Sequence, residues 1–142
     1  MEIIKLTSDV PSYLKLREIK NELLDFIVIL NDKYSSIDFS FWFCFRALTD
    51  NAIESGWKSK VTFYKKHNAL SFDIIMSEIE FIPYKKDMAT QRKIMGKYFY
   101  PFFKESIIKY AKKLPSLKPI AENLILDMEK FLTEKEWLSP AE

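Results

Sequence analysis

Residues 37–45, IDFSFWFCF, constrain the fold of this chain more than any other segment. Every odd position is branched or aromatic, in five consecutive matches to a two-residue period. Because successive side chains of a strand point to opposite faces, this pattern predicts a strand with one continuous apolar face. A helix is the alternative, since Phe41, Phe45 and Leu48 also recur at three- and four-residue steps and Gly56 could end it. We favour the strand.

The second face of this strand raises a separate question. Trp42 and Cys44 occupy even positions, where a face in contact with water would carry polar side chains. In a three-strand meander this segment would be an edge strand, and an exposed apolar edge is prone to aggregation unless something covers it. The sequence therefore predicts that Trp42 is covered by another element of the chain or belongs to a surface that meets a partner.

Two further strands are predicted on either side of a turn at residues 66–68. The segments 57–66 and 69–81 are rich in branched and aromatic residues. Asn68 tolerates the left-handed backbone conformation that tight turns use, so the two segments should form a hairpin. Residues 2–6, EIIKL, are an additional strand candidate.

Helices are predicted over residues 11–31, 87–114 and 119–137, where apolar residues recur at steps of three or four. Asp87 is a good N-cap candidate for the second of them. Pro101 lies inside that same helix, where a proline removes a backbone hydrogen bond and clashes with the preceding turn, at a cost of about 3 kcal/mol. We therefore expect a kink there, or two helices that meet.

These elements together predict one α+β domain over residues 1–142. Its small antiparallel β-sheet, of about three strands, packs against three main α-helices, and the helix from Asp87 is kinked near Pro101.

The composition excludes several kinds of active site. The 142 residues include only two glycines, Gly56 and Gly96, so neither a phosphate-binding P-loop nor a dinucleotide-binding fingerprint can form. A single cysteine and a single histidine exclude a zinc cluster of Cys and His ligands. His67 falls in the predicted lysine-rich turn, and Glu78 and Glu80 are best explained as a solvated strand face. We predict no catalytic residues, no cofactor and no metal site, and therefore a protein that is not an enzyme.

The sequence also predicts where the protein works. No apolar run approaches the roughly 20 residues that a membrane-spanning helix needs. The first residues, MEIIKLTSDVPS, lack the pattern of a signal peptide. A single cysteine cannot form an internal disulfide, so nothing indicates an oxidising compartment. We expect a cytoplasmic protein with no membrane partner.

Charge is unevenly distributed along the chain. The formal net charge is +2, but residues 57–118 hold 14 basic and 5 acidic side chains and so carry +9, whereas residues 1–56 and 119–142 are acidic. A basic segment of this kind attracts an acidic protein surface or a nucleic acid. Internal pairing of the acidic ends with the basic middle is the alternative interpretation.

Two blocks, NAIESGWKSKVTFYKKHNALSFDI and QRKIMGKYFYPFFKESIIKY, resemble the hairpin-then-helix core of some bacterial immunity proteins, as found in contact-dependent inhibition and related polymorphic-toxin systems. The resemblance implies a non-catalytic protein that neutralises a cognate toxin by forming a tight complex that occludes its active site. Many immunity proteins against nucleases are acidic, and the basic middle of this chain departs from that pattern.

The contacts with such a partner should rest on a few aromatic or arginine anchors supported by complementary charge. The candidates for partner binding are Trp42, Arg46, Trp57, Tyr64, Lys65 and Lys66. For each aromatic residue among them, packing in the core is the competing role. The alternative function is that of a nucleic-acid-binding accessory protein, which would use the lysine-rich middle segment together with stacking rings such as Tyr64.

Overall fold

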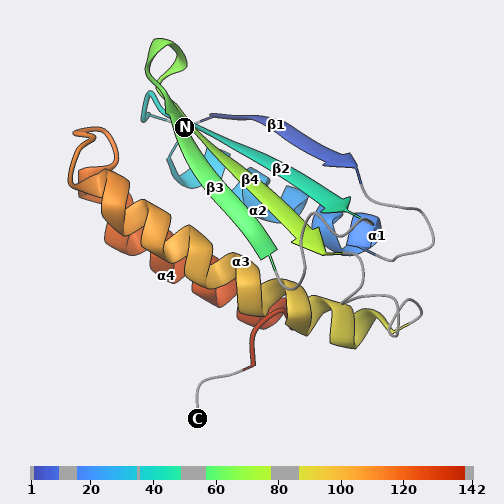
Figure 1. The fold of residues 1–142 in the computed structure, drawn as a ribbon. Coiled ribbons are helices and arrows are strands. Elements are labelled where there is room, and N and C mark those ends of the chain that lie inside the picture. Colours follow the sequence, from blue (N-terminus) through green and yellow to red (C-terminus); the bar gives the residue numbers. More distant parts are fainter. Residues whose placement is uncertain (1, 10–15, 35, 49–56, 78–86, 140–142) are drawn as a thin grey trace.

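The computed structural model describes residues 2–9, 16–34, 36–48, 57–77 and 87–139. The predicted α+β class is confirmed, and Figure 1 shows the sheet lying against a layer of helices. The elements, in chain order, are β1 (Glu2–Asp9), α1 (Leu16–Asn21), α2 (Leu23–Lys33), β2 (Ser40–Leu48), β3 (Trp57–Tyr64), the 3-10 turn η1 (Lys65–His67), β4 (Ala69–Ser77), α3 (Met88–Ala111), the 3-10 turn η4 (Lys118–Ile120) and α4 (Ala121–Glu134).

The sheet is mixed, and the prediction that it is antiparallel is wrong. Its four strands lie in the order β1-β2-β4-β3. β1 is parallel to β2, and β2 is parallel to β4, whereas β3 and β4 form the predicted antiparallel hairpin. Adjacent parallel strands need a crossover connection, and α1 and α2 belong to the crossover between β1 and β2. The strand interpretation is confirmed for residues 40–48, whereas residues 37–39 precede the strand, and the strand candidate at residues 2–6 is confirmed as part of β1.

β2 is an interior strand, so the expectation that it forms an edge is wrong. It pairs along its length with both β1 and β4. Its backbone is therefore hydrogen-bonded on both sides, so no strand edge is exposed at β2. Trp42 and Cys44, on the face opposite Phe41 and Phe43, are half-buried.

The core lies between the inner face of the sheet and the helices. Phe41 and Phe43 of β2 are buried there beside Phe72 of β4. The rings of Phe43 and Phe72 stack with centroids 5.3 Å apart, and Phe72 lies 5.4 Å from Phe103 of α3. Aromatic pairs in this range add to the stabilisation from burial alone. The predicted apolar face of residues 37–45 is thus confirmed through Phe43.

The helix predicted over residues 11–31 is interrupted at Glu22. Around that residue the backbone bonds shift to the shorter i−3 pattern, from Glu22 N–H to Ile19 and from Asp25 N–H to Glu22. α3, in contrast, runs without a break through Pro101, so the alternative of two separate helices there is wrong. The predicted apolar stripes are buried in all the helices, at Ile19, Leu23, Phe26 and Leu30, at Met95, Phe99, Phe103 and Ile107, and at Ile120, Leu124, Met128 and Phe131.

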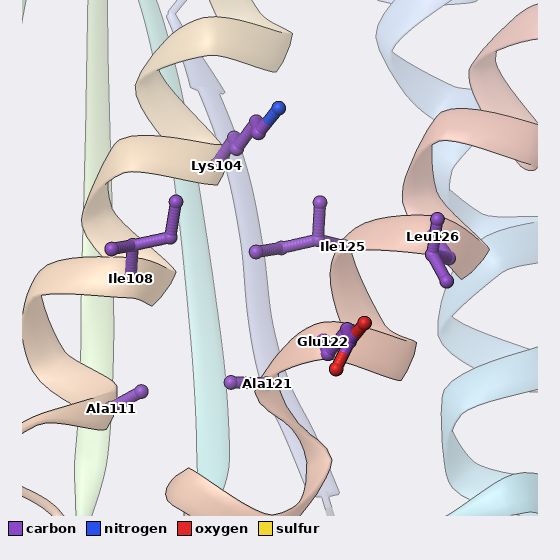
Figure 2. A pocket seen from close by; sticks show the side chains of 7 residues that line it. All are labelled: Lys104, Ile108, Ala111, Ala121, Glu122, Ile125 and Leu126. Atoms are coloured by element: carbon purple, nitrogen blue, oxygen red, sulfur yellow. The ribbon is translucent and has the colours of Figure 1, made fainter.

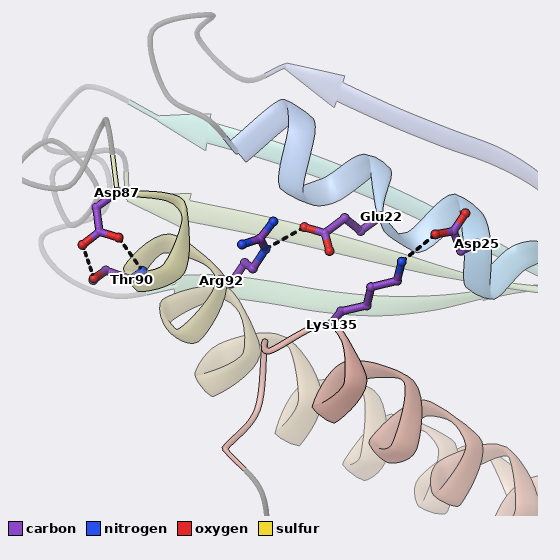
Figure 3. A network of polar contacts seen from close by, with 6 residues as sticks. All are labelled: Glu22, Asp25, Asp87, Thr90, Arg92 and Lys135. Atoms are coloured by element: carbon purple, nitrogen blue, oxygen red, sulfur yellow. Dashed lines mark hydrogen bonds and ion pairs between the residues drawn. The ribbon is translucent and has the colours of Figure 1, made fainter.

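Ion pairs join α2 and its N-cap residue Glu22 to α3 and to the residue that follows α4 (Figure 3). The Arg92 guanidinium lies 2.9 Å from Glu22, and the Lys135 ammonium 2.7 Å from Asp25. The hydrogen bond from Lys135 to Asp25 raises the pKa of Lys135 above its usual value. Each such partly exposed pair contributes at most about 1 kcal/mol. Their main effect is therefore to set the register between helices that the core already holds together.

The C-terminal end of α4 folds back into the core. Glu136 adopts a left-handed backbone with φ 66°, and the Trp137 N–H donates to the Leu132 carbonyl at 2.8 Å. This is the Schellman arrangement that ends many helices. It places the buried Trp137 ring against Phe99, with centroids 6.1 Å apart. Its backbone passes so close to Gly96 of α3 that a Cβ at Gly96 would overlap the Trp137 carbonyl.

This contact predicts that Gly96→Ala destabilises the protein. In an open helix the same change would stabilise by about 1 kcal/mol, because alanine has the higher helix propensity. Here the overlap with backbone should reverse the sign and cost about 1–3 kcal/mol, measured by urea unfolding. Lys97→Ala, at the exposed neighbouring position, is the control and should change the free energy of unfolding little. A Gly96→Ala variant as stable as the parent would contradict the contact.

Asp87 caps α3 as predicted, and this gives a test by pH. Its carboxylate accepts hydrogen bonds from the Thr90 hydroxyl at 2.6 Å and from the Thr90 N–H at 3.1 Å, which lower the pKa of Asp87. A carboxyl whose pKa is lower in the folded state stabilises it above the unfolded pKa, and that stabilisation is lost as pH falls through the folded value.

We therefore expect Asp87→Ala to lower the melting temperature at pH 7, with a difference from the parent that shrinks below the ordinary aspartate pKa of 3.8. Asp87→Asn keeps a capping oxygen at every pH and should melt nearer the parent at pH 7. Melting followed by circular dichroism between pH 7 and pH 2 measures both. A difference between the alanine variant and the parent that stays constant over this range would show that the charge of the cap has no role.

Candidate partner-binding surface

The face of the sheet opposite the core is not covered by any helix of the described residues. We call it the open face. Its rows follow from the strand register: Trp42 of β2 is level with Ser71 of β4, which is level with Thr62 of β3. In the next row Ala69 of β4 is level with Tyr64 of β3.

An aromatic cluster lies at the hairpin end of the open face. The rings of Trp42 and Tyr64 stack with centroids 5.3 Å apart, although their strands are separated by β4. The stack can cross β4 because the two residues that it passes over, Ala69 and Ser71, are small and buried. The ring of His67 lies 5.6 Å from Trp42. The turn and two strands thus meet around one half-buried tryptophan.

The sequence left open whether Trp42 is covered by another element of the chain or lies at a surface. The residue is half-buried, and its indole N–H is shielded from water yet has no acceptor among the described residues. A shielded N–H without an acceptor costs about 1–3 kcal/mol. Tyr64 remains 43% exposed and forms the outer side of the stack. The cluster therefore presents an exposed aromatic surface.

Cations surround this cluster. Lys65 and Lys66 are exposed in η1, and the turn ends at Asn68, whose φ of 49° confirms the left-handed conformation expected there. The Asn68 side chain donates to the Asp38 carbonyl, which ties the turn to the segment before β2. No ion pair among the described residues involves the two lysines. The hairpin tip therefore carries exposed positive charge.

The structure brings together four of the six candidate residues. Trp42, Tyr64, Lys65 and Lys66 share the hairpin end of the open face. Trp57 starts β3 at its opposite end, about seven strand residues or roughly 23 Å from Tyr64, so it does not join them.

Arg46 lies in β2 level with Ile75, and its side chain, like that of Trp57, is outside the described part. His67 was expected to be an exposed turn residue, and it is exposed. Its contact with Trp42 was not anticipated, because it depends on the long-range pairing of β2 with β4. Glu78 and Glu80 lie outside the described residues.

A hollow lies between α3 and α4, on the helical side of the molecule (Figure 2). Its volume is about 370 Å³, and its lining is almost entirely aliphatic apart from Lys104 and Glu122. Within the described part of the chain, no three His, Cys, Asp or Glu side chains gather into a group that could hold a metal ion. No helix in that part has the length and apolarity to cross a membrane.

Comparison with known proteins gives one match. The sequence profile of a family described as immunity protein 44 matches residues 2–134, which is nearly the whole chain. No curated protein and no solved structure matched the chain.

The stack across β4 predicts an energetic coupling between Trp42 and Tyr64. In a double-mutant cycle with Trp42→Ala and Tyr64→Ala, the coupling free energy should be about 0.5–1.5 kcal/mol, measured by urea unfolding. Tyr64→Phe keeps the ring and should leave the stability close to that of the parent. A cycle with Tyr110→Ala, whose ring lies in the contact with Phe63, is the matched control and should show no coupling to Trp42. Additive effects of the first pair would contradict the stack.

Proposed function

Because the chain belongs to the immunity protein 44 family, whose general role is to neutralise a toxin, we propose that it binds a cognate bacterial toxin through the open face of its sheet. In this proposal the protein forms a tight complex in the cytoplasm and blocks the toxin's active site sterically, without chemistry of its own. The observation that carries the proposed binding surface is the exposed stack of Trp42 and Tyr64 beside the exposed lysines of η1.

This surface has the composition of a binding hot spot. Affinity at protein interfaces is concentrated in a few aromatic and arginine residues near the centre of the contact. Tyr64 offers an exposed ring that is already held in place by Trp42, so little side-chain freedom is lost on binding. Arg46, on the same strand as Trp42, is a further proposed contact.

Charge indicates which part of a toxin this surface meets. Three exposed lysines lie on or beside the open face, namely Lys60 of β3 and Lys65 and Lys66 of η1, and the strand register places one acidic residue, Asp73, level with Lys60. Their net positive charge favours an acidic patch on the toxin and accelerates association with it. A groove that binds a polyphosphate chain is itself basic, so this face would be repelled by the substrate groove of a nuclease.

A nucleic-acid-binding role is the second candidate, because stacked rings beside lysines also occur in single-strand binding sites. Trp42 is less suited to that role, since its ring is already stacked on Tyr64 and has the ring of His67 5.6 Å away. Salt dependence separates the two functions: retention on single-stranded DNA should fall steeply with salt if phosphates are the ligand.

The toxin-binding proposal is tested with the toxin domain encoded by the adjacent gene. Co-expression should protect cells, and the purified proteins should form a nanomolar complex that abolishes the toxin's activity. Tyr64→Ala should weaken the complex by about 2 kcal/mol, or roughly 30-fold, if it is a hot-spot residue. Lys65→Glu with Lys66→Glu should mainly slow association. Binding is followed by surface plasmon resonance.

Lys112→Glu with Lys113→Glu is the matched control, because these two exposed lysines follow α3 and are not part of the open face. That variant should bind as the parent does. Normal binding by both open-face variants would reject the surface while leaving the toxin-binding role intact. Absence of both complex and protection would reject the toxin-binding role itself.

A further inference from the structure

The outermost strand of the sheet, β3, has one free edge. It pairs with β4 on one side, and no other described strand pairs with it. Figure 1 shows this outer edge beside α3, with no strand beyond it. We infer that the toxin adds an extended segment with acidic side chains to this edge, as a further strand of the sheet. The inference rests on the proposed toxin binding and states how the toxin is held.

The strand register identifies which backbone groups of β4 point toward β3. The Ser40 N–H donates to the Asn68 carbonyl at 3.1 Å, and Ser40 is level with Ala69 in the parallel pair of β2 and β4. In a parallel pair, the N–H and C=O of one residue bond to the two residues that flank its partner. Asn68 and every second residue after it, such as Leu70 and Phe72, therefore bond to β2. The residues between them, from Ala69 onward, point their backbone groups at β3.

The same alternation continues on β3. Ala69 is level with Tyr64, so Tyr64 and every second residue before it hydrogen-bond to β4. The residues between them, Ser59, Val61 and Phe63, turn their N–H and C=O groups away from β4. Outside the sheet, no backbone hydrogen bond between described residues involves these three. A row of unpaired strand groups is a template on which another strand can pair.

The two edges of the sheet differ in how well they are protected. β1, the opposite edge, has a register shift between Glu2 and Lys5. Such an irregularity bends a strand and makes it a poor template. β3 pairs with β4 without any shift from Trp57 to Tyr64, and it contains no proline. Of the two edges, β3 is therefore the one suited to accept a strand.

The helical side of this edge has room for side chains. A hollow of about 340 Å³ lies between β3 and α3, and its lining includes Ser59, Val61 and Phe102. Ser106 also lines it, with a side chain that is only 5% exposed and a hydroxyl that has no hydrogen-bond partner among the described residues. Side chains of an added strand would alternate between the two faces of the sheet. Those on the helical face would enter this hollow, where the Ser106 hydroxyl offers a hydrogen bond.

Charge selects the chemistry of the added strand. The described charged side chains of β3, η1 and the hollow, together with Asp73 level with Lys60, are four cations and two anions: Lys60, Lys65, Lys66, Lys109, Asp73 and Glu105. Their net charge is +2, four minus two. Lys60 and Asp73 form no ion pair with each other. An added strand with acidic side chains is therefore favoured over a basic one.

The same charge disfavours a second copy of β3 as the added strand. Two antiparallel registers pair the most residues of β3 with itself while the open faces stay aligned, and they are centred on Lys60 and on Val61. These registers place the Lys60 side chains of the two copies directly opposite each other or on the adjacent diagonal. Like charges opposite each other destabilise a sheet. The toxin is thus the occupant that charge favours.

Amide hydrogen exchange, followed by NMR, tests the inference with the toxin domain encoded by the adjacent gene. In the free protein the N–H groups of Ser59, Val61 and Phe63 should exchange fast, whereas those of Lys60 and Thr62, which bond to β4, should be protected. Toxin binding should slow the outward amides relative to the inward ones by at least about tenfold. The inward amides are the internal control for any general stabilisation of the protein.

Ser59→Pro removes one outward donor and leaves the bonds to β4 in place. An edge strand tolerates a proline whose missing N–H would point to solvent, so the variant should keep the circular dichroism spectrum of the parent. It should weaken the complex by about tenfold in surface plasmon resonance, because a hydrogen bond to the added strand is lost. Ser59→Ala keeps the N–H and is the matched control, which should bind as the parent does.

Lys109→Glu tests the charge of the added strand. It places an anion in the hollow, so it should weaken binding of an acidic segment by about threefold or more. Lys112→Glu is its control, because Lys112 is exposed and does not line the hollow. Equal binding by the two variants would overturn the acidic character of the strand.

The outcomes separate this inference from the proposed function. A complex in which the outward amides exchange as fast as in the free protein, or normal binding by folded Ser59→Pro, would overturn the added strand while leaving toxin binding intact. Outward amides already protected in the free protein would overturn it too, because this chain or a second copy would then cover the edge. If Ser59→Pro does not fold, the exchange rates decide. Absence of any complex would reject the proposed function and this inference with it.

Discussion

The pairing of β2 with two parallel neighbours is the constraint on which the rest of the structure depends. Because β1 and β4 flank this strand, its inner residues Phe41 and Phe43 form the centre of the core rather than its margin. The same placement puts Trp42 on the opposite face, with β4 between it and β3. Its stack with Tyr64 therefore has to cross β4. One strand thus determines both the hydrophobic core and the aromatic surface opposite it.

Local structure could be predicted from the sequence because its signals are short-range. The two-residue period identified β2, the three- and four-residue steps identified the buried stripes of the helices, and Asp87 and Asn68 were identified from the backbone conformations that aspartate and asparagine favour. Strand order could not be predicted in this way. Nothing in residues 40–48 distinguishes β3 from β4 as a neighbour, because pairing partners are chosen by the packing of the whole sheet.

The candidate surface could likewise be predicted from the sequence only where its residues are close together in the chain. Tyr64, Lys65 and Lys66 could be grouped from the sequence because they are consecutive, and Trp42 because it breaks the polar alternation. The pairing of the strands places His67 beside Trp42 and leaves Trp57 at the far end of β3, outside the group. Residues that meet across a sheet carry no mark of this in their own neighbourhood. The family match confirms the resemblance to immunity proteins that the two sequence blocks indicated, and with it the general role of neutralising a toxin.

The strand order also has a kinetic consequence. β3 and β4 are joined by a short turn and can pair early, since closing a small loop costs little entropy. β2 must then add to β4 in parallel, and β1 to β2 across the α1–α2 crossover, both through contacts between distant parts of the chain. Such non-local pairing slows folding. The hairpin should therefore be the template on which the sheet is assembled, so that the turn with its two lysines is among the first parts of the molecule to acquire its final shape.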